Sequence, residues 1–220
     1  MLNPKLNLIF LLTAAVYLAT LPYTPYFMQF AVKSLPIFVL LAIAWTQLSG
    51  KLRPTIMCAL IASAAGDILL ALSFEGSFVF GLGAFLVAQL IYAVTFFKHR
   101  TTLTSPANRV ILSTAILGFA TVMAFYILPS ANELFIPVAA YLSIITFMGI
   151  SGALSNMHRI TVIGALSFIA SDAILAQSIF KTPLPYSSFL VMTTYYFAQY
   201  LILKGLIVKQ QTFTSDETAK

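Results

Sequence analysis

Charged side chains are scarce in this chain. Asp, Glu, Lys and Arg together make up 8% of its 220 residues, against about 25% in a typical soluble domain. So few charges cannot cover a water-facing surface, which excludes a soluble globular domain and a disordered chain. Hydrophobic residues make up 60% of the chain, and its mean hydropathy is +0.96. The composition therefore indicates an integral membrane protein whose surface lies mostly against lipid.

Cysteine and histidine are nearly absent. Cys58 is the only cysteine, so an intrachain disulfide is excluded, and His99 and His158 are expected in loops, which disfavours a Cys/His metal site. The chain also lacks a Walker loop, a Gly-x-Ser-x-Gly elbow and a His-Glu-x-x-His motif. We therefore expect no metal and no cofactor, and any chemistry is left to carboxylates, a lysine, tyrosines and amides.

Long apolar stretches account for almost the whole chain. Most are long enough to cross about 30 Å of hydrocarbon at about 1.5 Å per helical residue. They predict an all-α polytopic bundle of eight transmembrane helices in a single domain, residues 1–208, with a disordered cytoplasmic tail, residues 209–220. The stretches are Leu6–Leu21, Phe30–Leu48, Pro54–Ser73, Phe78–Phe97, Arg109–Leu128, Leu134–Ile150, Ile160–Phe180 and Pro185–Val208.

The first stretch has an alternative interpretation as a signal-peptide core, because Lys5 precedes it and it contains small residues. The segment Leu21-Pro22-Tyr23 that follows is a poor cleavage site, which favours a retained helix.

The basic residues predict the topology. The net charge is +6, but lysines and arginines occur only one to three at a time between apolar segments, which argues against nucleic-acid binding. Ten of the twelve fall at the chain ends or in the loops that follow the second, fourth and sixth apolar stretches. The positive-inside rule then places both termini in the cytoplasm, and in a bacterium the protein would lie in the inner membrane.

Only two of the six acidic residues lie within apolar stretches, Asp67 in the third and Asp172 in the seventh. A carboxylate in hydrocarbon costs several kcal/mol, so an intramembrane acid is a candidate functional residue. Asp67 follows Arg53 by 14 residues and Asp172 follows Arg159 by 13, which puts both roughly 20 Å above the cytoplasmic ends of their helices. We therefore expect two buried aspartates that face one cavity, although either could instead only bond a neighbouring helix.

The surroundings of the two aspartates are alike. Residues 65–71 (AGDILLA) parallel residues 170–176 (ASDAILA), and glutamine and tyrosine follow in the next stretch each time. This similarity predicts a weak parallel repeat, in which the seventh and eighth helices repeat the third and fourth. The candidate polar residues near the aspartates are Gln89, Tyr92, Tyr195, Tyr196 and Gln199; their alternative role is helix packing.

Lys33 is the remaining unusual charge, near the outer end of the second stretch. It could extend to the outer headgroups, bind a lipid phosphate, or keep a carboxylate ionised. Pro36, three residues later, would open the helix locally.

These residues resemble those of the lysoplasmalogenase family of multi-pass membrane proteins. The chain departs from the family pattern at Gln89, where the family often has histidine, and at Ser34, where proline commonly follows the lysine. The matching segments are Lys33-Ser34-Leu35-Pro36, Gly66-Asp67-Ile68-Leu69-Leu70, residues 80–85 (FGLGAF) through Tyr92, residues 171–176 (SDAILA) and residues 195–202 (YYFAQYLI).

The resemblance implies hydrolysis of the vinyl ether bond of lysoplasmalogens, to a fatty aldehyde and glycerophosphoethanolamine or glycerophosphocholine. Asp67 and Asp172 would be the catalytic acid and base, and Lys33, Gln89, Tyr92, Tyr195, Tyr196 and Gln199 would bind the lysophospholipid substrate. Two other functions stay open: a proton- or cation-coupled transporter that uses the same aspartates, and a lipid-binding scaffold. The expected partners are this substrate and membrane lipid.

Overall fold

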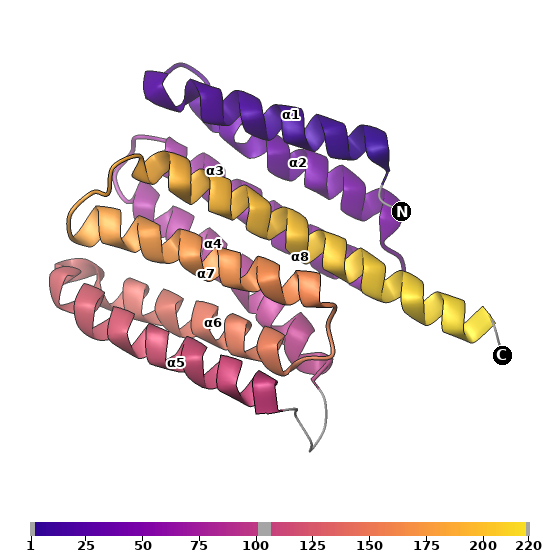
Figure 1. Ribbon diagram of the computed structural model, residues 1–220. Coiled ribbons are helices and arrows are strands. Elements are labelled where there is room, and N and C mark those ends of the chain that lie inside the picture. Colours follow the sequence, from indigo (N-terminus) through magenta and orange to yellow (C-terminus); the bar gives the residue numbers. More distant parts are fainter. Residues whose placement is uncertain (1–2, 101–106, 219–220) are drawn as a thin grey trace.

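The computed structural model describes residues 3–100 and 107–218, with side chains described as far as residue 212. Eight helices in this part of the chain are long and apolar enough to cross a membrane, as the sequence predicts, and no strand occurs among the described residues. Three short 3₁₀ helices, Leu21–Tyr23, Leu128–Ser130 and Asn132–Leu134, extend two of the helical hairpins. The eight helices are α1 (Pro4–Thr20), α2 (Gln29–Gln47), α3 (Leu52–Ala71), α4 (Ser77–Lys98), α5 (Ala107–Ile127), α6 (Phe135–Leu154), α7 (Arg159–Phe180) and α8 (Ser187–Thr218) (Figure 1).

Local sequence signals explain several helix starts. The Asn3 side chain accepts a hydrogen bond from the backbone N–H of Lys5, 3.1 Å away, and Pro4 occupies the first helical position, where no N–H is needed. Gly76 adopts φ +81° just before α4, a left-handed conformation that glycine accepts without steric cost. Most helices are joined by short connections such as the one that contains Gly76, so most consecutive helices are antiparallel neighbours.

Six helices form a closed ring. Going round it, α2 packs on α3, α3 on α4, α4 on α6, α6 on α7, α7 on α8, and α8 again on α2 (Figure 1). The remaining two helices lie outside, α1 against α2 and α8, and α5 against α6 and α7. The ring therefore encloses an interior to which side chains from distant parts of the sequence can contribute.

Small residues let the paired helices approach closely. A Cβ atom added to Gly66 of α3 would lie 2.6 Å from the Phe85 ring of α4, and one added to Gly164 of α7 would lie 2.7 Å from the backbone nitrogen of Ile202 in α8. Neither contact tolerates a larger residue without a shift of the partner. These two glycines thus bring α3 to α4 and α7 to α8 at the level of the interior residues described below.

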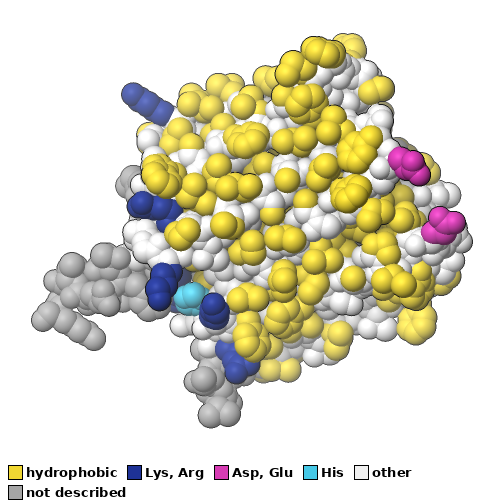
Figure 2. Space-filling model, turned by 180° about the vertical axis from the view of Figure 1, so that it is seen from behind, with side chains coloured by type: hydrophobic (Ala, Val, Ile, Leu, Met, Phe, Trp, Pro, Cys, Tyr) yellow, Lys and Arg dark blue, Asp and Glu magenta, His cyan; other side chains and the backbone are white. Residues whose placement is uncertain are grey.

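The outer surface is suited to lipid. Large apolar side chains such as Phe27 and Phe125 are 93% and 81% exposed. Figure 2 shows hydrophobic side chains covering the visible face, with lysines and arginines at one end and acidic residues at the other. The molecule is thus a multi-pass membrane protein whose two ends differ in charge.

The C-terminal segment differs from the sequence prediction. Helix α8 continues to Thr218 and includes most of residues 209–220, which the sequence analysis assigned to a disordered tail; residues 219–220 lie outside the described part. The physical reason is that Gly205 is the last helix-breaking residue, and adding residues to an existing helix is easier than starting one.

Candidate functional site

A cavity of about 430 Å³ lies in the half of the bundle away from the basic end, and it extends from the interior of the ring to the outer helices α1 and α5. Residues from all eight helices line it, most of them apolar. Asp67, Asp172, Lys33, Tyr141 and Tyr195 contribute the ionisable side chains central to its chemistry. An apolar cavity of this size with a few convergent polar groups is typical of a binding site for a small ligand.

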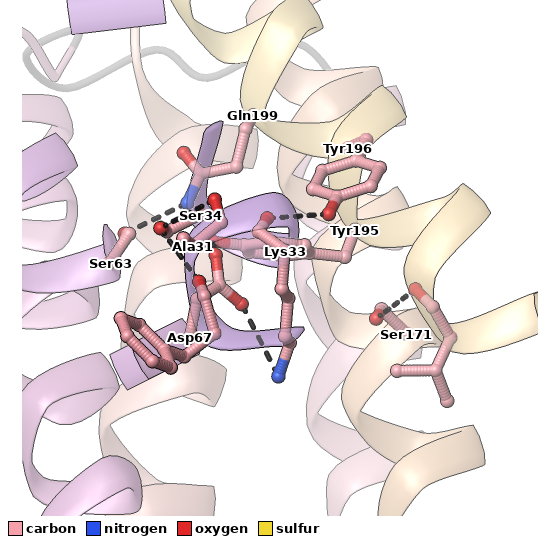
Figure 3. A network of polar contacts seen from close by, with 11 residues as sticks. Ala31, Lys33, Ser34, Ser63, Asp67, Ser171, Tyr195, Tyr196 and Gln199 are labelled. Atoms are coloured by element: carbon pink, nitrogen blue, oxygen red, sulfur yellow. Dashed lines mark hydrogen bonds and ion pairs between the residues drawn. The ribbon is translucent and has the colours of Figure 1, made fainter. Parts of the chain in front are cut away.

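Asp67 is held by residues from two other helices. It lies near the end of α3 and is only 1% exposed. The Lys33 Nζ atom of α2 is 3.6 Å from its Oδ1 atom, and the Tyr195 hydroxyl of α8 donates a hydrogen bond of 2.8 Å to its Oδ2 atom. Figure 3 shows the Lys33 side chain extending toward Asp67. A cation and a hydrogen-bond donor therefore compensate the burial of this carboxylate.

The backbone around Lys33 is fixed by α8. Pro36 removes one hydrogen bond from this turn of α2, and the Tyr196 hydroxyl donates to the Lys33 carbonyl oxygen at 2.7 Å (Figure 3). Lys33 is buried, so the interpretation that it extends to the outer headgroups is wrong. Among the described residues, Asp67 is the carboxylate with which Lys33 pairs.

Asp172 has a different environment, and here the expectation of two buried aspartates needs correction. Asp172 is only partly buried, because α7 packs less closely on α6 than α3 packs on α4, which leaves the Asp172 side chain more open to the cavity. The Tyr141 hydroxyl of α6 donates a hydrogen bond of 2.6 Å to its Oδ2 atom. Among the described residues no lysine, arginine or histidine pairs with it. The two carboxyl groups therefore share a cavity but not a partner.

Four of the eight predicted site residues line the cavity, Asp67, Asp172, Lys33 and Tyr195. The other four are buried among the helices and do not line it; they are Gln89, Tyr92, Tyr196 and Gln199.

Gln199 joins three helices behind Asp67. Its Oε1 atom accepts a 2.8 Å hydrogen bond from the Tyr92 hydroxyl of α4, and its Nε2 atom donates one of 2.8 Å to the Ser63 hydroxyl of α3. The amide of Gln89 is completely buried and makes no hydrogen bond to the residues that the structure describes. This layer lies on the side of Asp67 toward the basic end and closes the cavity there.

Aromatic contacts orient the Tyr195 hydroxyl. The ring of Tyr195 packs edge-to-face on Phe85 and Phe168, with ring centroids 5.6 and 5.5 Å apart. Such contacts contribute to stability and restrict the ring. The phenol is therefore directed at Asp67 by the packing of α4 and α7.

Tyr141 is the site residue that the sequence analysis missed. Its helix precedes that of Asp172 in the chain, as the helix of Lys33 precedes that of Asp67. Tyr141 lies 31 residues before its aspartate and Lys33 lies 34 before its own, so extending the repeat by one helix would have indicated the position.

Fold and site together define a multi-pass helical membrane protein with two carboxyl groups in an intramembrane cavity. The chain belongs to the YhhN family, whose model matches residues 28–206.

Proteins similar to this chain include three lysoplasmalogenases. TMEM86A of Bos taurus is 34% identical over 95% of this chain and 91% of its own length. TMEM86B of Homo sapiens is 34% identical over 78% of this chain and 72% of its own length. A lysoplasmalogenase of Mycobacterium bovis is 30% identical over 67% of this chain and 58% of its own length. No solved structure matches the chain.

Proposed function

We propose that this protein hydrolyses the vinyl ether bond of lysoplasmalogens, with Asp67 and Asp172 as the catalytic residues. The observation that carries the proposal is the pair of differently partnered carboxyl groups on one apolar cavity. The similarity to lysoplasmalogenases over most of the chain supports the choice of substrate. The products would be a fatty aldehyde and glycerophosphoethanolamine or glycerophosphocholine.

The reaction requires an acid and a base. A proton is added to the carbon of the double bond that is remote from oxygen, and the adjacent carbon and oxygen become an oxocarbenium ion. Water then attacks that carbon and loses a proton to the base, which gives a hemiacetal. The hydroxyl group of the hemiacetal then gives its proton back to the acid, the glycerol oxygen takes the proton held by the base, and the bond between that oxygen and the hemiacetal carbon breaks. The aldehyde is released and both carboxyl groups return to their starting states. One water molecule is consumed, and paired carboxyl groups divide the same roles in glycoside hydrolysis.

The partners of the two aspartates indicate which one acts as the acid and which as the base. Asp67 faces a lysine and is suited to remain a carboxylate, which would stabilise the oxocarbenium ion and accept the proton from water. Asp172 has a single neutral hydrogen-bond donor and no cationic partner among the described residues. We therefore assign Asp172 as the acid that protonates the vinyl ether.

For Lys33 we favour the ion-pair role over the phosphate-binding role. Its Nζ atom is within salt-bridge distance of Asp67, and this contact places a positive charge beside the proposed carboxylate. Tyr195 would contact the substrate at the cavity wall. The four residues that do not line the cavity would hold the surrounding helices in place; they are Tyr92, Gln89, Tyr196 and Gln199.

The proposal includes the topology. With both termini in the cytoplasm, the cavity lies in the outer half of the membrane. The ring of two helix triplets, α2–α4 and α6–α8, supports a parallel repeat in which each aspartate takes one partner from the preceding helix.

A transporter that uses the same aspartates would have to carry a proton or cation past the Tyr92, Gln199 and Ser63 layer. Hydrogen bonds close that layer below Asp67. This arrangement favours a site that opens to one side of the membrane, as a hydrolase needs.

The test is an assay of the purified protein with a lysoplasmalogen for release of aldehyde. The matched control substrate is the saturated 1-O-alkyl lysophospholipid, which has no double bond to protonate. We expect aldehyde from the first substrate and none from the second. Absence of aldehyde from both, with a folded protein, would contradict the proposed function.

A further inference from the structure

A second cavity, of about 750 Å³, lies at the basic end of the molecule, remote from the aspartates. Residues at the basic ends of α3, α4 and α8 line it, together with Met157 of the connection between α6 and α7. Leu206 of α8 is 1% exposed, whereas Leu90 and Val94 of α4 are 40% and 39% exposed. Leu206 therefore forms the floor of the cavity, and Leu90 and Val94 form a wall at the protein surface. The cavity is thus a groove that opens sideways, toward lipid.

Basic residues surround one end of the groove. Lys51 just before α3, Lys98 and His99 at the end of α4, and Lys209 of α8 all line it, and none of the described residues that line it is acidic. Figure 2 shows a histidine flanked by lysine or arginine side chains at this end of the molecule. The first turn of α3 also opens onto the groove through Leu52 and Thr55, and the start of a helix favours negative charge.

The rest of the groove is apolar. Leu90, Ile91 and Val94 of α4 continue from the basic residues into the membrane-spanning part of the helix, opposite Leu206. An amphiphile with a negative headgroup and a hydrocarbon chain matches both parts, because basic pockets between transmembrane helices bind anionic headgroups. A soluble phosphate would match only the basic part.

We propose that this groove binds an anionic phospholipid of the leaflet at the basic end of the protein, with its phosphate among Lys51, Lys98 and Lys209 and an acyl chain along Leu90 and Val94. The site is separate from the cavity that holds Asp67 and Asp172, and its occupancy does not depend on the reaction proposed there. The lipid would fix the α3, α4 and α8 ends relative to one another.

The experiment is a titration of the purified full-length protein in detergent with phosphatidylglycerol, followed by native mass spectrometry. Phosphatidylcholine with the same chains and inorganic phosphate are the comparison ligands. The Lys51→Gln/Lys98→Gln double variant should bind phosphatidylglycerol roughly 30-fold more weakly than the wild type, from about fivefold for each lysine removed. Lys204→Gln is the matched control, since Lys204 lies on α8 over the Tyr200 ring and does not line the groove.

A second variant tests the apolar part without a change of charge. Val94→Trp should fill the groove and weaken phosphatidylglycerol binding by at least about tenfold, whereas Val110→Trp on the exposed face of α5 should not. Equal binding of phosphatidylcholine and phosphatidylglycerol, or unchanged binding in both the lysine and Val94 variants, would overturn the proposal. Displacement of the lipid by millimolar inorganic phosphate would also overturn it, because the groove would then be a phosphate site.

Discussion

Lys33 and Asp67 form an ion pair between α2 and α3, with 3.6 Å between Nζ and Oδ1, inside a bundle built almost entirely from apolar side chains. Asp172 lies on the other side of the ring. Among the residues that the structure describes, only the Tyr141 hydroxyl forms a hydrogen bond with its side chain. This difference gives two carboxyl groups of one cavity different chemistry. The following predictions test that difference.

Replacement of either aspartate by asparagine should greatly reduce turnover without unfolding the protein. Asp67→Asn and Asp172→Asn keep the shape of the side chain but cannot exchange a proton, so each should lower kcat at least about 10²-fold. The control is Glu75→Gln, in the loop between α3 and α4, which should retain wild-type kcat. Near-normal turnover in either aspartate variant would remove that residue from the mechanism.

The pH dependence should be bell-shaped. Activity needs one carboxyl group protonated and the other ionised, so kcat should fall at both low and high pH, with apparent pKa values that belong to the pair. The measurement is kcat between pH 4 and 9 on a substrate held well above KM. A single sigmoidal limb would indicate that only one group titrates in the reaction.

Loss of Lys33 should affect both stability and kcat. Lys33→Met leaves the Asp67 carboxylate buried without its cation, which should destabilise the protein by about 3–5 kcal/mol. The double variant Lys33→Met/Asp67→Asn removes both charges and should recover much of that stability but no activity. Thermal unfolding in micelles checks the first effect.

The kinetics of Lys33→Met separate its two candidate roles. The ion-pair role predicts a lower kcat and a changed pH profile with little change in KM. The matched control is Lys181→Met, which removes a lysine that bonds Ser130 outside the cavity. A raised KM with an unchanged kcat would instead indicate that Lys33 binds the substrate phosphate.

Tyr141→Phe removes the hydroxyl that positions Asp172 and leaves the ring. We expect kcat to fall about tenfold, as for a lost hydrogen bond in the transition state, and the limb of the pH profile that Asp172 controls to move. Tyr195→Phe, at Asp67, is the comparison variant and should move the other limb. If both variants gave the same pH profile as the wild type, the phenols would have only packing roles.

Gly66→Ala tests the close contact of α3 and α4. The added methyl group would lie 2.6 Å from the Phe85 ring, which should destabilise the protein by about 1–3 kcal/mol. Gly83→Ala on α4 is the control, because nothing lies within 4 Å of its added methyl group. It should leave stability unchanged or slightly raised. Thermal unfolding of both variants in the same detergent compares them.

The sequence predicts the helices and both aspartates for clear physical reasons. Apolar stretches of membrane-spanning length have one stable structure in lipid, and a carboxylate within such a stretch is too costly to be common. Tyrosine and glutamine carry no comparable cost. Their positions in an apolar helix therefore do not separate Tyr195, which lines the cavity, from Tyr92 and Gln199, which lie behind it.

Tyr141 could not be found from its own stretch, because a single tyrosine among apolar residues is usually a packing residue. Its role follows from the ring, which brings α6 next to α7 at the level of Asp172. The partial exposure of Asp172 likewise depends on the cavity, whose volume is a property of the packed helices and not of any one helix.

The most direct test of the two-carboxyl mechanism is turnover of a lysoplasmalogen in D₂O, with mass analysis of the trapped aldehyde. Protonation of the double bond by a deuterated Asp172 would place one deuterium on the carbon next to the carbonyl group in each product molecule. The wild type should yield singly deuterated aldehyde, and Asp67→Asn and Asp172→Asn should yield almost none. Aldehyde without deuterium at that carbon, or full yield from the Asp172 variant, would contradict the account.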